Sequence, residues 1–183
     1  MEYSKIIQKV DRSIRQLLKN EQANLERNIS ERNLSSHLAF YFKRRFNEFD
    51  IDPEYNGSID YKTNYKKGLE IAEYKINRIK KERNDNNFYR ITPDIIIHKR
   101  GVDEKNLVVI EVKKDVSESK EKEYDFIILE ELTRDHCNNH FNYKLGIALE
   151  LGTGKNAGKH EIKYFQNGSK VDLNTVLMGD LEL

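Results

Sequence analysis

Two short runs of β-branched residues near the middle of the chain constrain its fold more than any other feature. They lie within residues 91–98 (ITPDIIIH) and 107–113 (LVVIEVK), and a polar segment over residues 99–106 separates them. Runs of this length and composition predict strands, and a polar turn between two strands predicts an antiparallel hairpin. Because both runs are apolar on both faces, we expect them in the centre of a sheet that is covered on two sides.

Charged residues stand at the end of this hairpin that lies away from the turn. Asp94 precedes the first strand, and Glu111 and Lys113 end the second. If the turn centres between Val102 and Asp103, Asp94 lies directly opposite Glu111, with Cβ atoms ~4.5–5.5 Å apart. Lys113 follows Glu111 by two residues and therefore shares its face. Two carboxylates and one ammonium group are thus predicted to meet between apolar strands.

Such a group needs a physical explanation, because neighbouring carboxylates repel and buried charges need partners. A divalent cation would relieve the repulsion, and Mg²⁺ suits a site with few protein oxygens because it keeps several waters. Mn²⁺ could substitute for it. A bound metal polarises a phosphoryl oxygen and lowers the pKa of water, while Lys113 could orient that water. The alternative is a buried salt-bridge network among the Asp, Glu and Lys side chains.

The remaining periodicities predict one mixed α/β domain over residues 1–183, with helices on both faces of the sheet. Apolar spacing predicts an N-terminal helix over residues 1–20, and Ser30 is a suitable N-cap for a second helix. A charged helical stretch over residues 65–83 lies within an insertion near 62–88. Further along, we expect a helix at 121–133, a strand at 145–151, and a last hairpin at 161–171 that turns at Asn167-Gly168.

Composition excludes several classes of protein. Lys and Arg total 32 against 31 Asp and Glu, so the net charge is +1 and any nucleic-acid site must be local. A single cysteine excludes a disulfide framework. No apolar run reaches the ~20 residues that span a bilayer, and the N-terminus lacks a signal-peptide core. We therefore expect a cytoplasmic protein that does not contact membranes.

The charged residues also carry a resemblance to a known family. Pro93-Asp94 followed by Glu111-Val112-Lys113 resembles the PD-(D/E)xK motif of the restriction-endonuclease-like nuclease superfamily. Ser30-Glu31-Arg32 at the head of a helix and the segment over residues 52–56 (DPEYN) extend the similarity to small stand-alone bacterial members. The resemblance covers about residues 25–170, apart from residues 58–90.

The resemblance implies a core of αβββαβ topology and metal-dependent hydrolysis of phosphodiester bonds. By position, Asp94 and Glu111 would be metal ligands, the Val112 carbonyl a third, and Lys113 the catalytic lysine. Glu31 would match a helix glutamate that often completes the metal site. Independently of the family, Glu31 precedes Leu34 by three residues and therefore lies on the buried stripe of its helix. The alternative for Glu31 is a favourable charge in the first helical turn.

These observations predict a Mg²⁺-dependent nuclease, foremost an endodeoxyribonuclease of the restriction, defence or repair type. Two alternatives stay open. One is a catalytically silent module on the same fold that binds nucleic acid or protein, and the other is a ribonuclease. Because no separate recognition domain is visible, specificity would come from the insertion, from a homodimer, or from DNA structure such as ends or branches.

Other candidate residues receive ordinary interpretations. Asp125 and Glu130 lie on the helix after the motif, where we interpret both as surface charge. The segment over residues 136–140 (HCNNH) has too few cysteines for structural zinc. The loop at 152–160 (GTGKNAGKH) lacks the spacing of a P-loop, and we expect a flexible basic loop that could touch phosphates.

Overall fold

The computed structural model of the chain describes residues 1–55, 68–70, 88–102, 106–135 and 141–180. Within these residues a six-stranded mixed sheet is flanked by helices, as the sequence predicts. Along the sheet the strands lie in the order β1 (Asp50–Pro53), β4 (Ile95–His98), β5 (Val108–Lys114), β6 (Leu145–Leu151), β7 (His160–Gln166) and β8 (Ser169–Val171). β5 and β6 are parallel, and the other neighbouring pairs are antiparallel.

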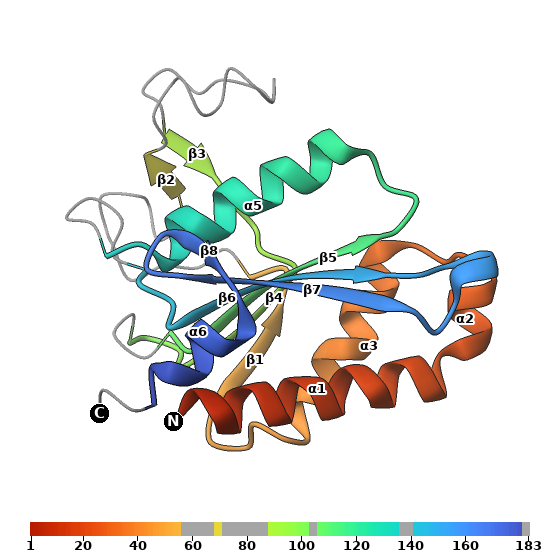
Figure 1. Cartoon of the computed structure of the whole chain (residues 1–183), viewed down its shortest axis with the longest axis horizontal. Coiled ribbons are helices and arrows are strands. Elements are labelled where there is room, and N and C mark those ends of the chain that lie inside the picture. The colour runs from red at the N-terminus through yellow and green to blue at the C-terminus, as the bar shows by residue number, and fades with distance from the viewer. Residues whose placement is uncertain (56–67, 71–87, 103–105, 136–140, 181–183) are drawn as a thin grey trace.

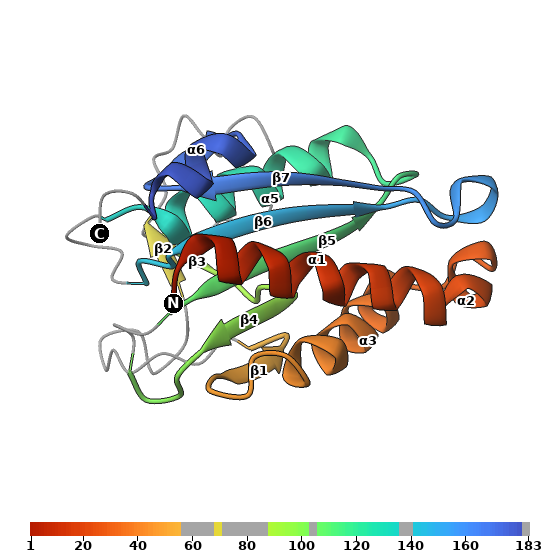
Figure 2. The same ribbon diagram turned by 60° about the horizontal axis from the view of Figure 1, so that its bottom comes forward.

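The helices lie in two layers, one on each face of the sheet (Figures 1 and 2). The first layer contains α1 (Tyr3–Asn20), α2 (Gln22–Glu26) and α3 (Glu31–Lys43), and α5 (Ser119–Thr133) covers the opposite face. Ser30 caps α3 by accepting a hydrogen bond from the Asn33 N–H at 3.3 Å, which confirms the predicted helix start. The short helix α6 (Leu173–Met178) follows β8, near the start of α1.

Alternation along the strands sorts the apolar residues into two clusters. The larger cluster joins α1 and α3 to the sheet face that carries Ile95, Ile110 and Val112. The smaller cluster packs Ile128, Leu129 and Leu132 of α5 against the face that carries Ile96, Val109 and Phe165. Glu111 and Lys113 belong to this second face, because they alternate with Ile110 and Val112. The polar residues of the motif therefore face α5.

The central hairpin has the predicted pairing, although its turn lies elsewhere. Ile95 is opposite Ile110 and Ile97 is opposite Val108, the register that the assumed turn requires. The chain reverses earlier, however, with Lys99 bridged to Val102. Pairing resumes when the Leu107 N–H donates to the Ile97 carbonyl at 2.9 Å. The predicted turn centre at Val102–Asp103 is therefore displaced, although the register is correct.

The insertion contains a second, two-stranded sheet. β2 (Gly68–Glu70) pairs antiparallel with β3 (Phe88–Arg90), so Gly68 lies opposite Arg90. The helix predicted over residues 65–83 is wrong at 68–70, because a strand partner nearly twenty residues away overrides a weak local helical pattern. The rest of the predicted helical insertion near 62–88 lies outside the described residues.

The turn after β6 is fixed to the end of β5 by one side chain. Asp115 follows β5 and accepts hydrogen bonds from the Thr153 N–H and hydroxyl, both at 3.0 Å, and from the Asn156 amide at 2.8 Å. Thr153 precedes the 3-10 helix η3 (Gly154–Asn156), and Asn156 is its last residue. The loop expected to be flexible is thus tied down close to the motif. Of the described helices, none has the length and apolarity needed to span a bilayer.

Candidate active site

Asp94 and Glu111 lie side by side, with Asp94 just before the start of β4 and Glu111 in the middle of β5. Asp94 immediately precedes Ile95, whose partner Ile110 immediately precedes Glu111. The Asp94 Oδ2 accepts a hydrogen bond of 2.8 Å from the Val112 N–H, which fixes this carboxylate across the two strands. Glu111 is buried, with 8% of its surface exposed, and Asp94 is partly buried. The predicted convergence of the two acids is therefore present in the structure.

Both carboxyl groups resist ionisation in this setting. Burial raises the pKa of Glu111 well above its ordinary value, and the neighbouring Asp94 and Asp125 carboxylates raise it further. Burial also raises the pKa of Asp94, although the Val112 N–H and the Lys113 ammonium oppose the shift. Such shifts mark carboxylates that lack enough positive charge nearby. A cation placed between the two acids would relieve both.

Lys113 lies on the same face and holds two further acids. Its Nζ is 3.1 Å from the Asp125 Oδ2 and 3.5 Å from the Glu31 Oε2. Burial alone would lower the pKa of Lys113, but the carboxylates of Asp125, Glu31 and Asp94 raise it above the ordinary value. The lysine is therefore charged at neutral pH, and it bridges the first turn of α3 and the middle of α5.

Glu31 already has a full set of donors. Its Oε1 accepts from the Lys114 N–H at 3.0 Å and from the Ser117 hydroxyl at 2.5 Å. Burial would raise the pKa of Glu31, but these hydrogen bonds and the Lys113 ammonium hold it below its ordinary value. The structure therefore connects Glu31 to the site through Lys113, and its role as a metal ligand stays a prediction.

Asp125 is a member of the site that sequence reasoning missed. The predicted surface charge is wrong for this residue, because Asp125 is buried with 7% of its surface exposed. Burial, together with the nearby Asp94 and Glu31 carboxylates, raises its pKa to about 6 against the opposing effect of Lys113. A signal existed in the sequence. Asp125 precedes Ile128 by three residues and Leu129 by four, so it shares the buried stripe of α5. Glu130 is only partly buried.

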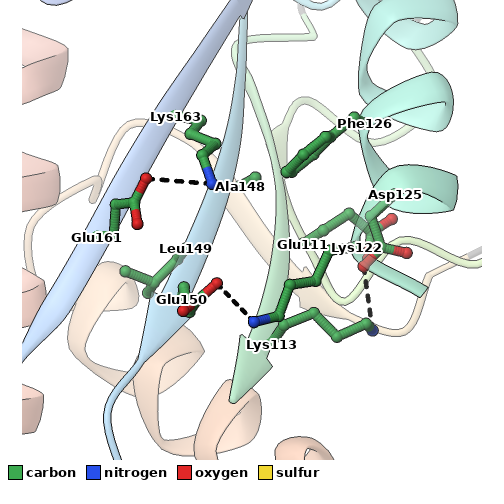
Figure 3. Close-up of a pocket in the computed structure, with 10 residues that line it drawn as sticks. All are labelled: Glu111, Lys113, Lys122, Asp125, Phe126, Ala148, Leu149, Glu150, Glu161 and Lys163. Carbon is green, nitrogen blue, oxygen red and sulfur yellow. Dashed lines mark ion pairs between the residues drawn. The ribbon is translucent and has the colours of Figure 1, made fainter. Parts of the chain in front are cut away.

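A cleft opens beside these residues, between α5 and strands β5 to β7 (Figure 3). The space within the cleft, including its opening to solvent, is about 290 Å³. Ala148 and Leu149 of β6 lie along it, and two ion pairs line its sides. Lys122 is 2.8 Å from Glu150, and Lys163 is 3.1 Å from Glu161. Together with Glu111, Lys113, Asp125 and Phe126, these residues line a charged cleft.

The predicted Mg²⁺ ion requires oxygen ligands, which the carboxylates of the site would supply. Among the described residues, no three or more His, Cys, Asp and Glu side chains lie close enough together to hold an ion. Asp94 and Glu111 form a two-carboxylate set, and Mg²⁺ accepts such a set because waters complete its shell. Their raised pKa values fit two acids that need a cation. The Val112 N–H donates to the Asp94 carboxylate, and the role of the Val112 carbonyl as a metal ligand stays a prediction.

Lys114 lies away from this centre, because it points to the opposite face of the sheet, where its Nζ donates to the Ile29 carbonyl at 3.4 Å. The segment over residues 136–140 lies outside the described residues. Comparison of the chain with protein-family models, with curated proteins and with solved structures gave no match. The function is therefore argued from the geometry of the site.

Proposed function

We propose that the protein is a metal-dependent nuclease that hydrolyses phosphodiester bonds, with DNA as the first substrate to test. The observation that carries this proposal is the alignment of Asp94 and Glu111 across β4 and β5, with Lys113 on the same face. Two acids with raised pKa values beside a charged lysine are costly in a core, and such costs are typical of functional sites.

The order of elements supports the same proposal. Along the chain α3, β1, β4, β5, α5 and β6 follow one another, and β5 is parallel to β6. This is the αβββαβ order that the resemblance implies, interrupted by the small β2–β3 sheet. Glu111 and Lys113 line the cleft, and Asp94 lies beside Glu111 at the start of β4, so a substrate in the cleft would lie next to this group.

Asp94 and Glu111 would hold the Mg²⁺ ion, and Mn²⁺ would substitute for it. When bound, the metal supplies a Lewis acid for the phosphoryl oxygen and lowers the pKa of water. Lys113 keeps its proton and places a positive charge beside the developing negative charge of the reaction. Asp125 and Glu31 hold the Lys113 ammonium from two sides and so position it.

The test is a cleavage assay with purified protein, supercoiled plasmid, single-stranded DNA and RNA, each with Mg²⁺, Mn²⁺ or EDTA. Asp94→Asn and Lys113→Ala are expected to abolish cleavage at temperatures where thermal unfolding shows that each variant is folded. Lys114→Ala is the matched control, because the side chain of this neighbouring lysine points to the opposite face, where its ammonium group donates to the Ile29 carbonyl.

The outcomes separate the candidate functions. Cleavage that persists equally in Asp94→Asn and Lys113→Ala comes from a contaminant and overturns the proposal. Metal-independent binding of DNA without cleavage indicates the silent binding module. RNA cleaved in preference to DNA indicates a ribonuclease with the same chemistry. Sedimentation of the active fraction tests for the homodimer.

A further inference from the structure

The sheet face below α5 has two parts with different chemistry, and the polar part extends well beyond the proposed catalytic group. The second half of α5 packs Leu129 and Leu132 on Val109 and Phe165. Over the first half, three neighbouring strands carry charged residues. Glu111 is aligned with Ala148 and Lys163, and Lys113 with Glu150 and Glu161. A salt-bridge network for stability alone does not need an open cleft at its centre (Figure 3).

Lys122 and Lys163 both line the cleft, but their partners hold them with different strength. Lys122 is fixed by Glu150 at 2.8 Å and by the Asp115 carbonyl at 3.1 Å, so it fastens α5 to the strand ends. Lys163 has the weaker partner, because the Glu161 side chain is 60% exposed and lies two residues away on the same strand. Exposed ion pairs contribute little, since water screens them. Lys163 can therefore exchange Glu161 for another anion.

Phe126 lies next to Lys163 and provides an aromatic surface in the cleft. The Lys163 ammonium lies 5.1 Å from the ring centroid, and the ring packs against Phe165 at 5.6 Å. An aromatic ring with a neighbouring cation is the pair that binds an unpaired nucleotide, because the ring stacks on the base and the cation neutralises the phosphate. Phe126 also lines the same cleft as Glu111 and Lys113.

The small side chain of Ala148 makes room for such a ligand. It lies between Glu111 and Lys163 in the strand register, where a larger residue would fill the cleft. Two strand spacings separate Glu111 from Lys163, roughly 10 Å, which one nucleotide can bridge. A span of one nucleotide between the acids and Lys163 fits an unpaired strand.

We propose that Phe126, Lys163 and Ala148 form a subsite for one unpaired nucleotide next to the scissile phosphate, so that the substrate is single-stranded nucleic acid or an unpaired end. The Lys163 ammonium, which lies over the Phe126 ring, leaves both the ring and Glu161 to bind the adjoining phosphate, and the base stacks on the face of Phe126 that it vacates. This inference rests on the proposed function for the position of the scissile phosphate, but the binding of the nucleotide requires no cleavage.

Binding is therefore measured without metal, as the fluorescence anisotropy of a labelled ten-nucleotide DNA in EDTA, with the matching RNA and the DNA duplex in parallel. Phe126→Leu keeps apolar volume but removes the ring, and it should weaken single-strand binding roughly tenfold. Lys163→Met should weaken it several-fold and reduce its salt dependence. Ala148→Leu should also weaken binding, because it fills the cleft without changing charge. Phe126→Tyr should restore stacking.

Phe40→Leu is the matched control, since Phe40 is also an aromatic ring beside a cation, Arg44 at 5.3 Å, but lies on the other helical layer. It should leave binding unchanged, and thermal unfolding of each variant shows whether the fold is intact. Asp94→Asn should lose cleavage and keep single-strand binding. No measurable single-strand binding by the wild type, or equal binding of all cleft variants and of duplex, overturns the subsite even if cleavage depends on Asp94. Cleft-dependent binding without any cleavage supports the subsite and overturns the nuclease.

Discussion

Two buried acids with charged neighbours, Asp52 and Glu111, lie on the same face of the sheet, and their pKa values shift in opposite directions. We call them, with their neighbours, the Asp52 cluster and the Asp94–Glu111 cluster. Asp52 of β1 and Glu111 of β5 each have 8% of their surface exposed. The Asp52 carboxylate accepts from both the His98 ring, at 2.9 Å, and the Arg100 guanidinium. Burial would raise the pKa of Asp52, but these partners hold it below its ordinary value. The pKa of Glu111 is instead raised, because its nearest charged neighbours include two carboxylates.

A buried acid does not by itself indicate a catalytic site. The Asp52 cluster balances its charge internally, so it stabilises the edge of the sheet at β1 and leaves nothing for a ligand to complete. The Asp94–Glu111 pair has one lysine nearby, and that lysine is shared with Asp125 and Glu31. Its electrostatic imbalance is what a metal and a substrate would relieve.

The largest contrast is expected in catalysis. Asp94→Asn keeps an acceptor for the Val112 N–H and should lower the rate of DNA cleavage about 10²-fold or more, by removing a charge required in the reaction. Asp52→Asn, the same substitution in the balanced cluster, should leave the cleavage rate within about twofold at temperatures where it is folded. Initial rates with plasmid and Mn²⁺ measure both. Similar losses in the two variants would contradict the distinction between the clusters.

Substitution should affect the free energy of unfolding more in the Asp52 cluster than in the Asp94–Glu111 cluster. Asp52→Asn leaves His98 and Arg100 without their charged partner and should reduce the free energy of unfolding by about 1–3 kcal/mol. Glu111→Gln relieves repulsion and should leave this free energy unchanged or higher. Urea unfolding at pH 7 without metal tests the pair. Equal destabilisation by both changes would show that Glu111 is well paired in the fold.

The pH dependence of stability should also separate the clusters. A carboxyl with a raised pKa binds more protons in the folded state, so the stability it contributes at low pH is lost as the pH rises. For Asp125, with a pKa of about 6, that loss falls between about pH 4 and 7. Asp125→Asn should therefore flatten the fall by roughly 2–3 kcal/mol. Asp52, with a lowered pKa, loses its contribution only as the pH falls below about 4.

Urea unfolding from pH 3 to 8 in EDTA measures these slopes. Asp52→Asn serves as the comparison, because it should alter only the acidic limb of the curve. A wild-type stability that rises steadily from pH 4 to 7, with no flattening in Asp125→Asn, would contradict the raised pKa values.

The smallest expected effect is that of the metal on thermal stability. Mg²⁺ at five times its dissociation constant should add about 1 kcal/mol to the free energy of unfolding of the wild type. Asp94→Asn should lose this gain, and Asp52→Asn should keep it. Melting temperatures with Mg²⁺ and with EDTA provide the measurement. A gain of equal size in Asp94→Asn would place the cation elsewhere on the protein.

Much of the central hairpin could be predicted from sequence, because its signals are local and mutually consistent. The apolar runs within residues 91–98 and 107–113 predict the strands, and alternation then places Glu111 and Lys113 on one face. The predicted position of the turn was wrong, but the predicted register was correct. The chain turns at the Lys99–Val102 bridge, and the residues between this bridge and β5 do not change how β4 and β5 pair.

The features that sequence reasoning missed depend on non-local contacts. Gly68–Glu70 forms a strand only because Phe88–Arg90 lies beside it. The cleft requires the alignment of β5, β6 and β7, so neither Lys163 nor Ala148 carries a signal in isolation. Asp125 is different. Its spacing from Ile128 and Leu129 is the same kind of evidence that was applied to Glu31, and a uniform treatment of helix stripes would have placed it in the core.

The attachment of Asp115 to Thr153 and Asn156 has a consequence for how the protein tolerates change. Asp115 comes two residues after Lys113, and the loop that it grips connects β6 to β7, which carry Glu150 and Lys163. Lengthening or shortening that loop would therefore shift both sides of the cleft together, even though the loop does not line it. Homologous chains that vary freely here should differ in which substrates they accept.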